Sequence, residues 1–401
     1  MLIRFQKTGL ATILAGLVAL TSSSFVHSEE SLTVLSIAGG GEHTCALLSN
    51  GTVRCWGNNR HGGLGNGTIT VQFESSVQVA TIDAARQIAA GVGSTCASLA
   101  DGTVRCWGDN EYGQLGNGTT TKTVVPVVVT GLHTATAVAV GFHHACALLK
   151  EGSIACWGRN EHGQLGNATQ RDSSIPVSVK GIATATALSA GDAHMCALLQ
   201  GGTVRCWGRN DSGQLGTGTK RDASTPVDVA ALQSVTAISA GNGFTCAVLS
   251  NGRIMCWGVN SVGQLGNGTR EEALLPVETT GITSAQTVDS GSHHACALLR
   301  EGRVKCWGFN AVGQLGNGAQ DYIGRPFHEQ SMLTPVEVVN LKSVRDVTTG
   351  QMHSCAVEGM TTVTCWGSNI NGGYYSREVN YATSTPVVIP VIPEGKSSGE
   401  K

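Results

Sequence analysis

Short apolar runs separated by polar, glycine-rich stretches recur along the chain. In residues 185–233, apolar runs lie at 187–190, 195–199, 203–207 and 226–229. The stretches between them are rich in Gly, Asn and Ser, which favour turns. No stretch of helical periodicity follows residue 28. The pattern predicts four short β-strands in each unit of about 50 residues.

The unit occurs seven times, and paired cysteines mark each copy. The two cysteines of a pair are ten residues apart, and Trp-Gly follows the second. Successive first cysteines are 51, 50, 50, 50, 50 and 59 residues apart. Four strands in each of seven units predict an all-β fold, a seven-bladed β-propeller of four-stranded antiparallel blades. An open β-solenoid is the alternative, but it would predict neither a fixed number of units nor closure. We expect a pairing of the chain termini to close the ring.

The cysteine spacing predicts one disulfide within each blade. Opposed residues of an antiparallel hairpin have a constant index sum, so Cys45 and Cys55 face each other around a three-residue turn, Ser49–Gly51. Gly51 then takes the left-handed position that glycine adopts without steric cost. The predicted Cα separation is about 4.5–5.5 Å. The predicted pairs are Cys45–Cys55, Cys96–Cys106, Cys146–Cys156, Cys196–Cys206, Cys246–Cys256, Cys296–Cys306 and Cys355–Cys365.

Metal binding and redox activity are alternative roles for these cysteines. Each hairpin supplies two thiolates, whereas zinc takes four ligands, and no Cys-x-x-Cys motif is present. We therefore expect no metal and no cofactor. In the seventh unit Gly359 precedes the usual turn position, which Thr361 occupies, so the turn there must differ.

The first 28 residues have the features of an export signal. Arg4 and Lys7 precede an apolar run, Leu10–Leu20, and cleavage is predicted after Ser28. The run is shorter than the ~20 residues that span a bilayer, and a buried first helix is the alternative. The predicted organisation is a signal peptide at 1–28, a propeller at 29–393 and a flexible C-terminal tail at 394–401.

Composition narrows the class of partner. Only 13% of the residues are charged and the formal net charge is −2. This excludes a strongly basic nucleic-acid binder and a polyanionic tail protein. We expect an extracytoplasmic monomer (secreted, periplasmic or at the cell surface) that binds no nucleic acid and does not insert into a membrane once the signal is removed.

A histidine stands two positions before the first cysteine in five units. It could form a metal or anion site near one mouth of the channel, or a buried hydrogen bond to loop backbone within its own blade. We expect the second arrangement. The leucines of the Gly-Gln-Leu-Gly segments and the tryptophans are expected to pack between blades. The histidines are His43, His144, His194, His294 and His353.

Two segments break the repeat. The spacing of 59 marks an insertion in the sixth unit, within residues 319–334, and the tail of the seventh unit covers residues 371–381. Together they hold four of the five tyrosines. Aromatic and Arg side chains are enriched at interface hot spots, so these segments are candidates for partner binding; a solvated, dispensable loop is the alternative. The candidate residues are Tyr322, Arg325, Phe327, His328, Tyr374, Tyr375, Arg377 and Tyr381.

The repeat motif resembles a known family. Ala-Gly-x-x-His-x-Cys-Ala-Leu-Leu, Gly-Thr-Val-x-Cys-Trp-Gly and Gly-Gln-Leu-Gly-Asn-Gly-Thr are similar to the repeats of the regulator of chromosome condensation family. The resemblance covers residues 34–390 and implies a seven-bladed propeller. Relatives of this type include a secreted bacterial propeller that inhibits β-lactamase. We therefore expect an exported protein–protein interaction module, a scaffold or an inhibitor-type binder, with no enzymatic activity and no catalytic residue.

Two other functions compete with this one. The family's namesake implies guanine-nucleotide exchange on a small GTPase, but the predicted signal peptide and the seven cysteine pairs argue against a cytosolic substrate. A propeller-based enzyme such as a lyase or glycosidase is the other alternative. It lacks a visible acid/base set in the sequence.

Overall fold

The computed structural model describes residues 32–70, 74–319, 329–368 and 382–392. All of them belong to one compact unit, Leu32–Lys401. The predicted signal peptide (1–28) and tail (394–401) lie outside the described residues.

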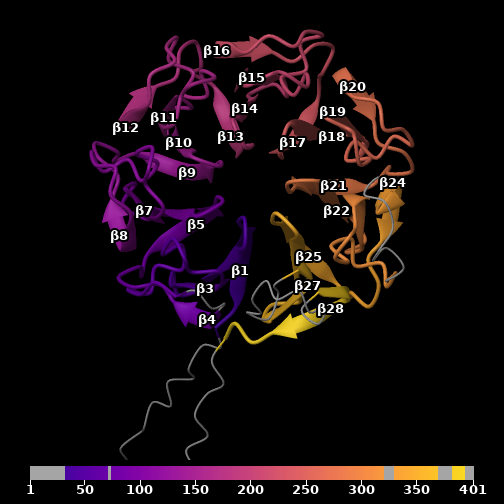
Figure 1. The fold of residues 1–401 in the computed structure, drawn as a ribbon, viewed down its shortest axis with the longest axis horizontal. Coiled ribbons are helices and arrows are strands. Elements are labelled where there is room, and N and C mark those ends of the chain that lie inside the picture. Colours follow the sequence, from indigo (N-terminus) through magenta and orange to yellow (C-terminus); the bar gives the residue numbers. More distant parts are fainter. Residues whose placement is uncertain (1–31, 71–73, 320–328, 369–381, 393–401) are drawn as a thin grey trace, which may run out of the picture. The chain divides into compact units, whose positions relative to one another are not determined.

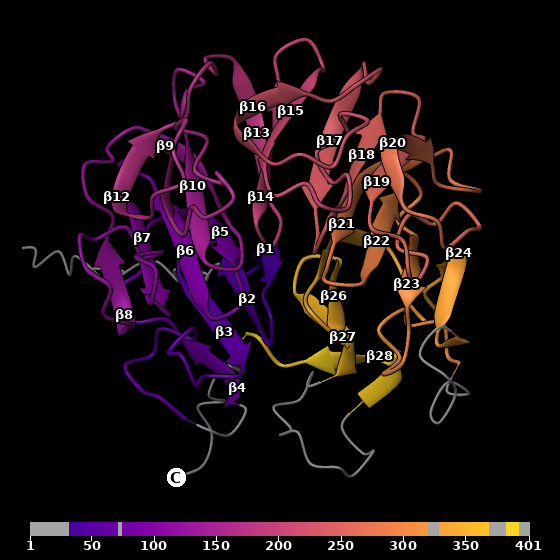
Figure 2. The same ribbon diagram turned by 45° about the horizontal axis from the view of Figure 1, so that its top comes forward.

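The described residues form seven four-stranded antiparallel sheets around a central channel (Figure 1). Each sheet is one blade and uses a contiguous stretch of chain. No helix appears among the elements of the described chain. The predicted seven-bladed propeller is confirmed. Figure 2 shows the strands of successive blades side by side.

The strands of each blade run in chain order from the channel outward. The innermost strands are β1 (Val34–Gly39), β5 (Ala85–Ala90), β9 (Ala135–Val140), β13 (Ala185–Ala190), β17 (Val235–Ala240), β21 (Ala285–Ser290) and β25 (Val344–Thr349). The second strands are β2 (His43–Leu48), β6 (Ser94–Leu99), β10 (His144–Leu149), β14 (His194–Leu199), β18 (Phe244–Leu249), β22 (His294–Leu299) and β26 (His353–Glu358). The third strands are β3 (Val53–Gly57), β7 (Val104–Gly108), β11 (Ile154–Gly158), β15 (Val204–Gly208), β19 (Ile254–Gly258), β23 (Val304–Phe309) and β27 (Thr362–Ser368). The outermost strands are β4 (Glu74–Gln78), β8 (Thr123–Val128), β12 (Ser173–Ser178), β16 (Ala223–Asp228), β20 (Ala273–Glu278), β24 (Ser331–Glu337) and β28 (Ala382–Ile389).

All seven predicted disulfides form. Each joins directly opposed residues of the second and third strands, as Cys45 and Cys55 do. The Cα atoms of the pairs are 4.0–4.1 Å apart, closer than predicted. Gly51 has the expected positive φ of 79°. In blade 7 the positive φ moves to Gly359, the first residue of the turn, and the hairpin keeps its register.

Leucine and tryptophan side chains pack between blades, as predicted. Leu115 of blade 2 and Trp157 of blade 3 are both fully buried and belong to one apolar cluster. The Trp157 indole N–H donates to the carbonyl of Gln114, 2.8 Å away, across the same interface. Burial of such large side chains is the main source of stability between blades.

The ring closes without an exchange of strands. Blade 1 consists of β1–β4 and blade 7 of β25–β28, so no blade combines strands from both termini. The expectation that the termini pair is therefore wrong. Blades 1 and 7 instead share an apolar cluster that includes Val34, Trp56, Val363 and Val391. Backbone bonds accompany this packing, from Val34 N to Met360 O at 2.8 Å and from Gln351 N to Gly41 O at 3.1 Å.

Candidate functional site

The candidate partner-binding residues taken from the two irregular segments are not placed by the structure. These residues stay predictions, because Tyr322, Arg325, Phe327, His328, Tyr374, Tyr375, Arg377 and Tyr381 lie outside the described residues. Among the described residues, the candidate site is formed by the channel and the loops around its mouth.

The histidines of the repeat link neighbouring blades. His43 Nε2 lies 2.8 Å from the Thr95 hydroxyl of the next blade. The same contact joins His194 to Thr245 at 2.9 Å. His294 contacts Ser354 in this way at 2.8 Å and His353 contacts Thr44 at 2.7 Å. The expected partner, loop backbone within the same blade, was wrong for these four histidines.

In three of the four contacts the imidazole is the donor, because the hydroxyl gives its proton to a backbone carbonyl. The Thr95 hydroxyl gives its one proton to the carbonyl of Gly63, 2.9 Å away, so His43 Nε2 must carry the hydrogen. Burial lowers the pKa of His43 to about 4 and that of His144 to about 3. The described residues contain no group of three or more His, Cys, Asp or Glu side chains arranged to hold a metal ion. The four contacts are thus structural ties between blades.

The fifth histidine makes no such contact with the next blade. His144 faces an interface where the residue equivalent to Thr95 is Met195, and both of its ring nitrogens are buried without a hydrogen-bond partner among the described residues. Where the histidine itself is replaced, by Ser94 or Phe244, the facing position of the next blade is alanine. The sequence therefore carried a signal for three of the ties, a hydroxyl residue 51, 52 or 60 positions after the histidine.

A ring of glycines lies above the histidines at the channel mouth. A Cβ on Gly141 would lie 2.3 Å from Cε1 of His144 and 2.4 Å from the carbonyl oxygen of Gly191 in the next blade. Both contacts are far shorter than van der Waals distance, so only glycine fits there. The equivalent residues of the other blades make similar approaches, and together the glycines let the inner strands converge at the mouth: Gly40, Gly91, Gly191, Gly241, Gly291 and Gly350.

This mouth encloses a cavity of about 290 Å³ lined by residues of all seven blades. Around it, polar side chains of one inner strand accept backbone N–H groups of the next. Ser189 accepts from Ala240 at 2.9 Å, and Ser239 accepts from Ser290 at 2.8 Å. Asp289 lines the cavity between blades 6 and 7.

An aromatic and charged cluster borders the cavity on blades 2 and 3. Phe142 lines the cavity and is 37% exposed, and its ring lies 4.4 Å from that of His143. His143 also contacts the Tyr112 ring at 4.7 Å and the Asp109 carboxylate at 3.7 Å. The Arg159 guanidinium lies over the Tyr112 ring, 4.7 Å from its centre. We call Asp109, Tyr112, Phe142, His143 and Arg159 the mouth cluster.

Ion pairs continue the mouth cluster onto blade 4. Arg159 pairs with Glu161 at 2.6 Å, and His162 lies 2.8 Å from Asp222 of the next blade. Arg209 occupies the position of Arg159 one blade further on and pairs with Asp211. In blades 5 and 6 the same position is uncharged, Val259 and Phe309. Charge is therefore concentrated on one side of the mouth.

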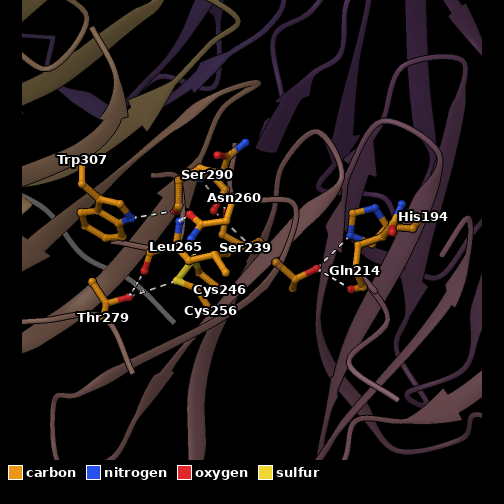
Figure 3. The surroundings of a disulfide bond; sticks show 12 residues. His194, Gln214, Ser239, Cys246, Cys256, Asn260, Leu265, Thr279, Ser290 and Trp307 are labelled. Atoms are coloured by element: carbon orange, nitrogen blue, oxygen red, sulfur yellow. Dashed lines mark hydrogen bonds between the residues drawn. A yellow bond between two sulfur atoms is a disulfide. The ribbon is translucent and has the colours of Figure 1, made fainter. Parts of the chain in front are cut away.

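One disulfide shows how the scaffold beneath the mouth is held. Cys246 and Cys256 join β18 to β19 in blade 5 (Figure 3). Thr279, directly after β20, places its hydroxyl 3.2 Å from the Cys256 sulfur and donates to the Leu265 carbonyl at 2.9 Å. The disulfide thus sits within a buried network that also fixes the long loop between the third and fourth strands.

The comparisons agree with the fold. Residues 16–327 match the RCC1-like domain family, and residues 301–357 match the regulator of chromosome condensation repeat. The first match covers more than half of the chain, so the protein belongs to the RCC1-like domain family. The resemblance seen in the repeat motif is confirmed.

Relatives share parts of this propeller. The chain is 31% identical over 111 residues to mouse E3 ubiquitin-protein ligase HERC2, which is 27% of this chain and 2% of that protein. The structure of Prp20p from Saccharomyces cerevisiae has a TM-score of 0.73 at 20% identity, covering 92% of this chain and 88% of that one. The CRINKLY WD40 ectodomain of the Arabidopsis thaliana receptor kinase ACR4 has a TM-score of 0.52 at 22% identity, covering 84% and 98%. The two structural matches show the fold alone.

The described residues contain no helix long and apolar enough to cross a membrane.

Proposed function

We propose that the protein is an exported, non-enzymatic binding module that presents the mouth cluster to a protein partner. The observation that carries the proposal is the cluster itself: Phe142 is exposed, and Tyr112, His143 and Arg159 are partly exposed beside it. Aromatic and Arg side chains dominate the energetics of protein interfaces. Because the cluster stands on a disulfide-bonded scaffold, a partner would lose little affinity to the ordering of this surface.

Export is supported by three observations. Seven disulfides with no free cysteine suit an oxidising compartment. Residues 1–28 have the charge and apolar pattern of a signal peptide. The fold is similar to that of a receptor-kinase ectodomain. We propose that the protein acts outside the cytoplasm as a monomer.

Guanine-nucleotide exchange is the second candidate. The fold is similar to that of Prp20p, whose structure was described together with its binding to Gsp1p and histones. Exchange on a cytosolic GTPase would place the seven disulfides in a reducing compartment, and this favours the binding module.

Affinity capture from the extracytoplasmic fraction of the producing organism tests the proposal. The baits are the wild-type protein, Arg159→Glu and the control Val128→Ser, which alters a half-exposed residue on β8. We expect one protein to bind the wild type and the control, and to be lost with Arg159→Glu. Equal capture by all three baits would contradict the role of the mouth cluster. Capture of a GTPase whose nucleotide release is accelerated would establish the second candidate instead.

A further inference from the structure

The cavity at the channel mouth has two unlike walls. The fifth residue of the innermost strand shows this difference between the blades. Blades 1 to 3 have alanine there, and blades 4 to 7 have hydroxyl or carboxyl side chains. In blade order the residues are Ala38, Ala89, Ala139, Ser189, Ser239, Asp289 and Thr348, and all seven line the cavity.

Asp289 is a carboxylate without a cation. Its oxygens accept hydrogen bonds from the Thr349 N–H at 2.6 Å, the Thr349 hydroxyl at 2.9 Å, the Thr348 hydroxyl at 3.2 Å and Ser239 at 3.4 Å. Within the described chain, none of the ion pairs involves Asp289, and no Lys or Arg lines the cavity. Burial raises the pKa of Asp289, because the carboxylate loses its hydration. An opposite charge beside it would compensate for this loss.

A second carboxyl strengthens the negative potential at this wall. Asp346 lies on the neighbouring strand β25 and accepts the Ile37 N–H at 3.0 Å. Burial and the nearby Asp289 raise the pKa of Asp346 to about 6. The third acid near the mouth, Asp192, already has a cation, since Arg209 Nη1 lies 3.6 Å away. The uncompensated charge is therefore at blades 6 and 7.

We propose that the cavity binds an aliphatic ammonium group, with the ammonium at Asp289 and the alkyl chain against the alanines of blades 1 to 3. An ammonium donates three hydrogen bonds and carries the charge that Asp289 lacks. The apolar wall stands across the channel from blade 6, because blades 2 and 3 are opposite it in a seven-membered ring (Figure 1).

The size of the cavity limits the ligand. Its volume of about 290 Å³ lies at the lower end of ligand pockets, which span about 300–1,000 Å³. It fits one short alkylammonium chain. That chain has two sources, a free amine or the lysine side chain of a protein. A lysine would connect the site with the proposed protein partner, whereas a free amine would make it independent of that partner.

Calorimetry on the full mature protein tests the site with three probes of equal chain length. We expect n-butylammonium to bind at least about ten-fold more tightly than n-butanol, because only the cation contacts the carboxylate, and we expect no binding of butyrate. NMR of alanine methyl groups should show shifts at Ala38, Ala89 and Ala139. Equal affinity for the cation and the alcohol, or shifts confined to other alanines, would overturn the proposal.

Two variants test whether the charge of Asp289 is needed for binding of n-butylammonium. Asp289→Asn keeps the shape of the side chain, and we expect it to weaken n-butylammonium binding at least about ten-fold. The control Asp228→Asn removes an exposed carboxylate on β16 and should leave binding unchanged. Unchanged binding to Asp289→Asn would contradict the site. If Asp289→Asn does not fold, the comparison of cation with alcohol in the wild type decides.

Nα-acetyl-lysine methylamide separates the two sources. Binding of this compound with the affinity of n-butylammonium would support a lysine of a partner protein. Binding of n-butylammonium alone would support a free amine. Failure of both cations overturns the ammonium site but leaves the mouth cluster untouched, because the capture experiment with Arg159→Glu does not involve Asp289.

Discussion

The interface between blades 7 and 1 is tied by polar contacts that the interface between blades 3 and 4 lacks. At the 7/1 interface, His353 Nε2 lies 2.7 Å from the Thr44 hydroxyl, and Asp346 accepts the Ile37 N–H. Thr348 accepts a further N–H, that of Gly39, at 2.8 Å. These bonds lie along both the inner and the second strands.

The 3/4 interface has neither kind of tie. His144 faces Met195 without a hydrogen-bond partner among the described residues. On the inner strand, Ala137 and Ala139 stand where Asp346 and Thr348 stand in blade 7. This interface has apolar packing and the indole bond from Trp207 to Gln164, at 2.9 Å. Outside the inner and second strands it also has the contact of His162 with Asp222, at 2.8 Å.

The two interfaces also differ in how the chain connects their blades. The chain continues directly from blade 3 into blade 4, through the residues between β12 and β13. A covalent link keeps the two surfaces at high effective concentration even with few polar ties. Blades 7 and 1 have no such link, since strands are not exchanged. Of these two joints, the noncovalent one carries the histidine and inner-strand ties.

Low pH should produce the largest difference in stability between the 7/1 and 3/4 interfaces. The pKa of His144 is lowered to about 3 and that of His353 to about 4 by burial, both below the unfolded value of 6.5. The unfolded state therefore takes up protons first, and stability falls as the pH drops from about 6.5 towards these values. Each of these histidines costs about 3 kcal/mol at pH 4.

At the 7/1 interface a carboxyl offsets this loss. The pKa of Asp346 is raised from 3.8 to about 6 by burial, so its protonation favours the folded state as the pH falls from about 6 to 4. Hydrogen exchange between pH 7 and 4 should therefore show β9 and β13 losing protection before β1 and β25. Simultaneous loss at both interfaces would contradict this.

A matched pair of deletions measures the histidine tie. His353→Ala and His144→Ala remove the same side chain from equally buried sites, so the cost of the cavity, about 2–4 kcal/mol, is common to both. His353→Ala also leaves the Thr44 hydroxyl without its hydrogen-bond partner. We expect it to lower the free energy of unfolding by about 1–2 kcal/mol more than His144→Ala does, as measured by urea denaturation. Equal losses would mean that the hydrogen bond adds nothing.

Removal of the disulfide should lower the free energy of unfolding equally in blade 7 and in blade 3. The bridges Cys355–Cys365 and Cys146–Cys156 close loops of the same length, with a separation of ten residues. Each double substitution to alanine should cost about 2–3 kcal/mol, again by urea denaturation. A clearly larger loss in blade 7 would show that its altered turn, with Gly359, depends on the disulfide.

The sequence predicted features set within one repeat. The strands expected at 187–190 and 195–199 are β13 and β14 to within a few residues, and Cys45 meets Cys55 because hairpin register is local. Contacts between repeats were harder. His43 and Thr95 are 52 residues apart, so their contact follows only once the order and spacing of blades around the ring are known.

The repeat pattern could not predict the residues of the candidate site. Asp289 stands in a position that holds alanine, serine or threonine in other blades, and nothing local reveals that it faces a cavity without a cation. The mouth cluster combines Tyr112 from blade 2 with Phe142 and Arg159 from blade 3. Such sites depend on loops of two blades converging, which repeat periodicity does not encode.

Adding one hydroxyl at the interface between blades 3 and 4 should raise the free energy of unfolding by a small amount. Ser189 accepts the Ala240 N–H between blades 4 and 5 at 2.9 Å, and Ala139 and Ala190 are the equivalent residues one blade earlier. Ala139→Ser should therefore accept the Ala190 N–H and raise the free energy of unfolding by about 0.5–1.5 kcal/mol. Thermal unfolding at pH 7 would measure the gain, with Ser189→Ala as the reciprocal loss. A gain here, added to a larger loss for Ser189→Ala, would show that the 3/4 interface is weak for want of a single acceptor and not because its packing is poor.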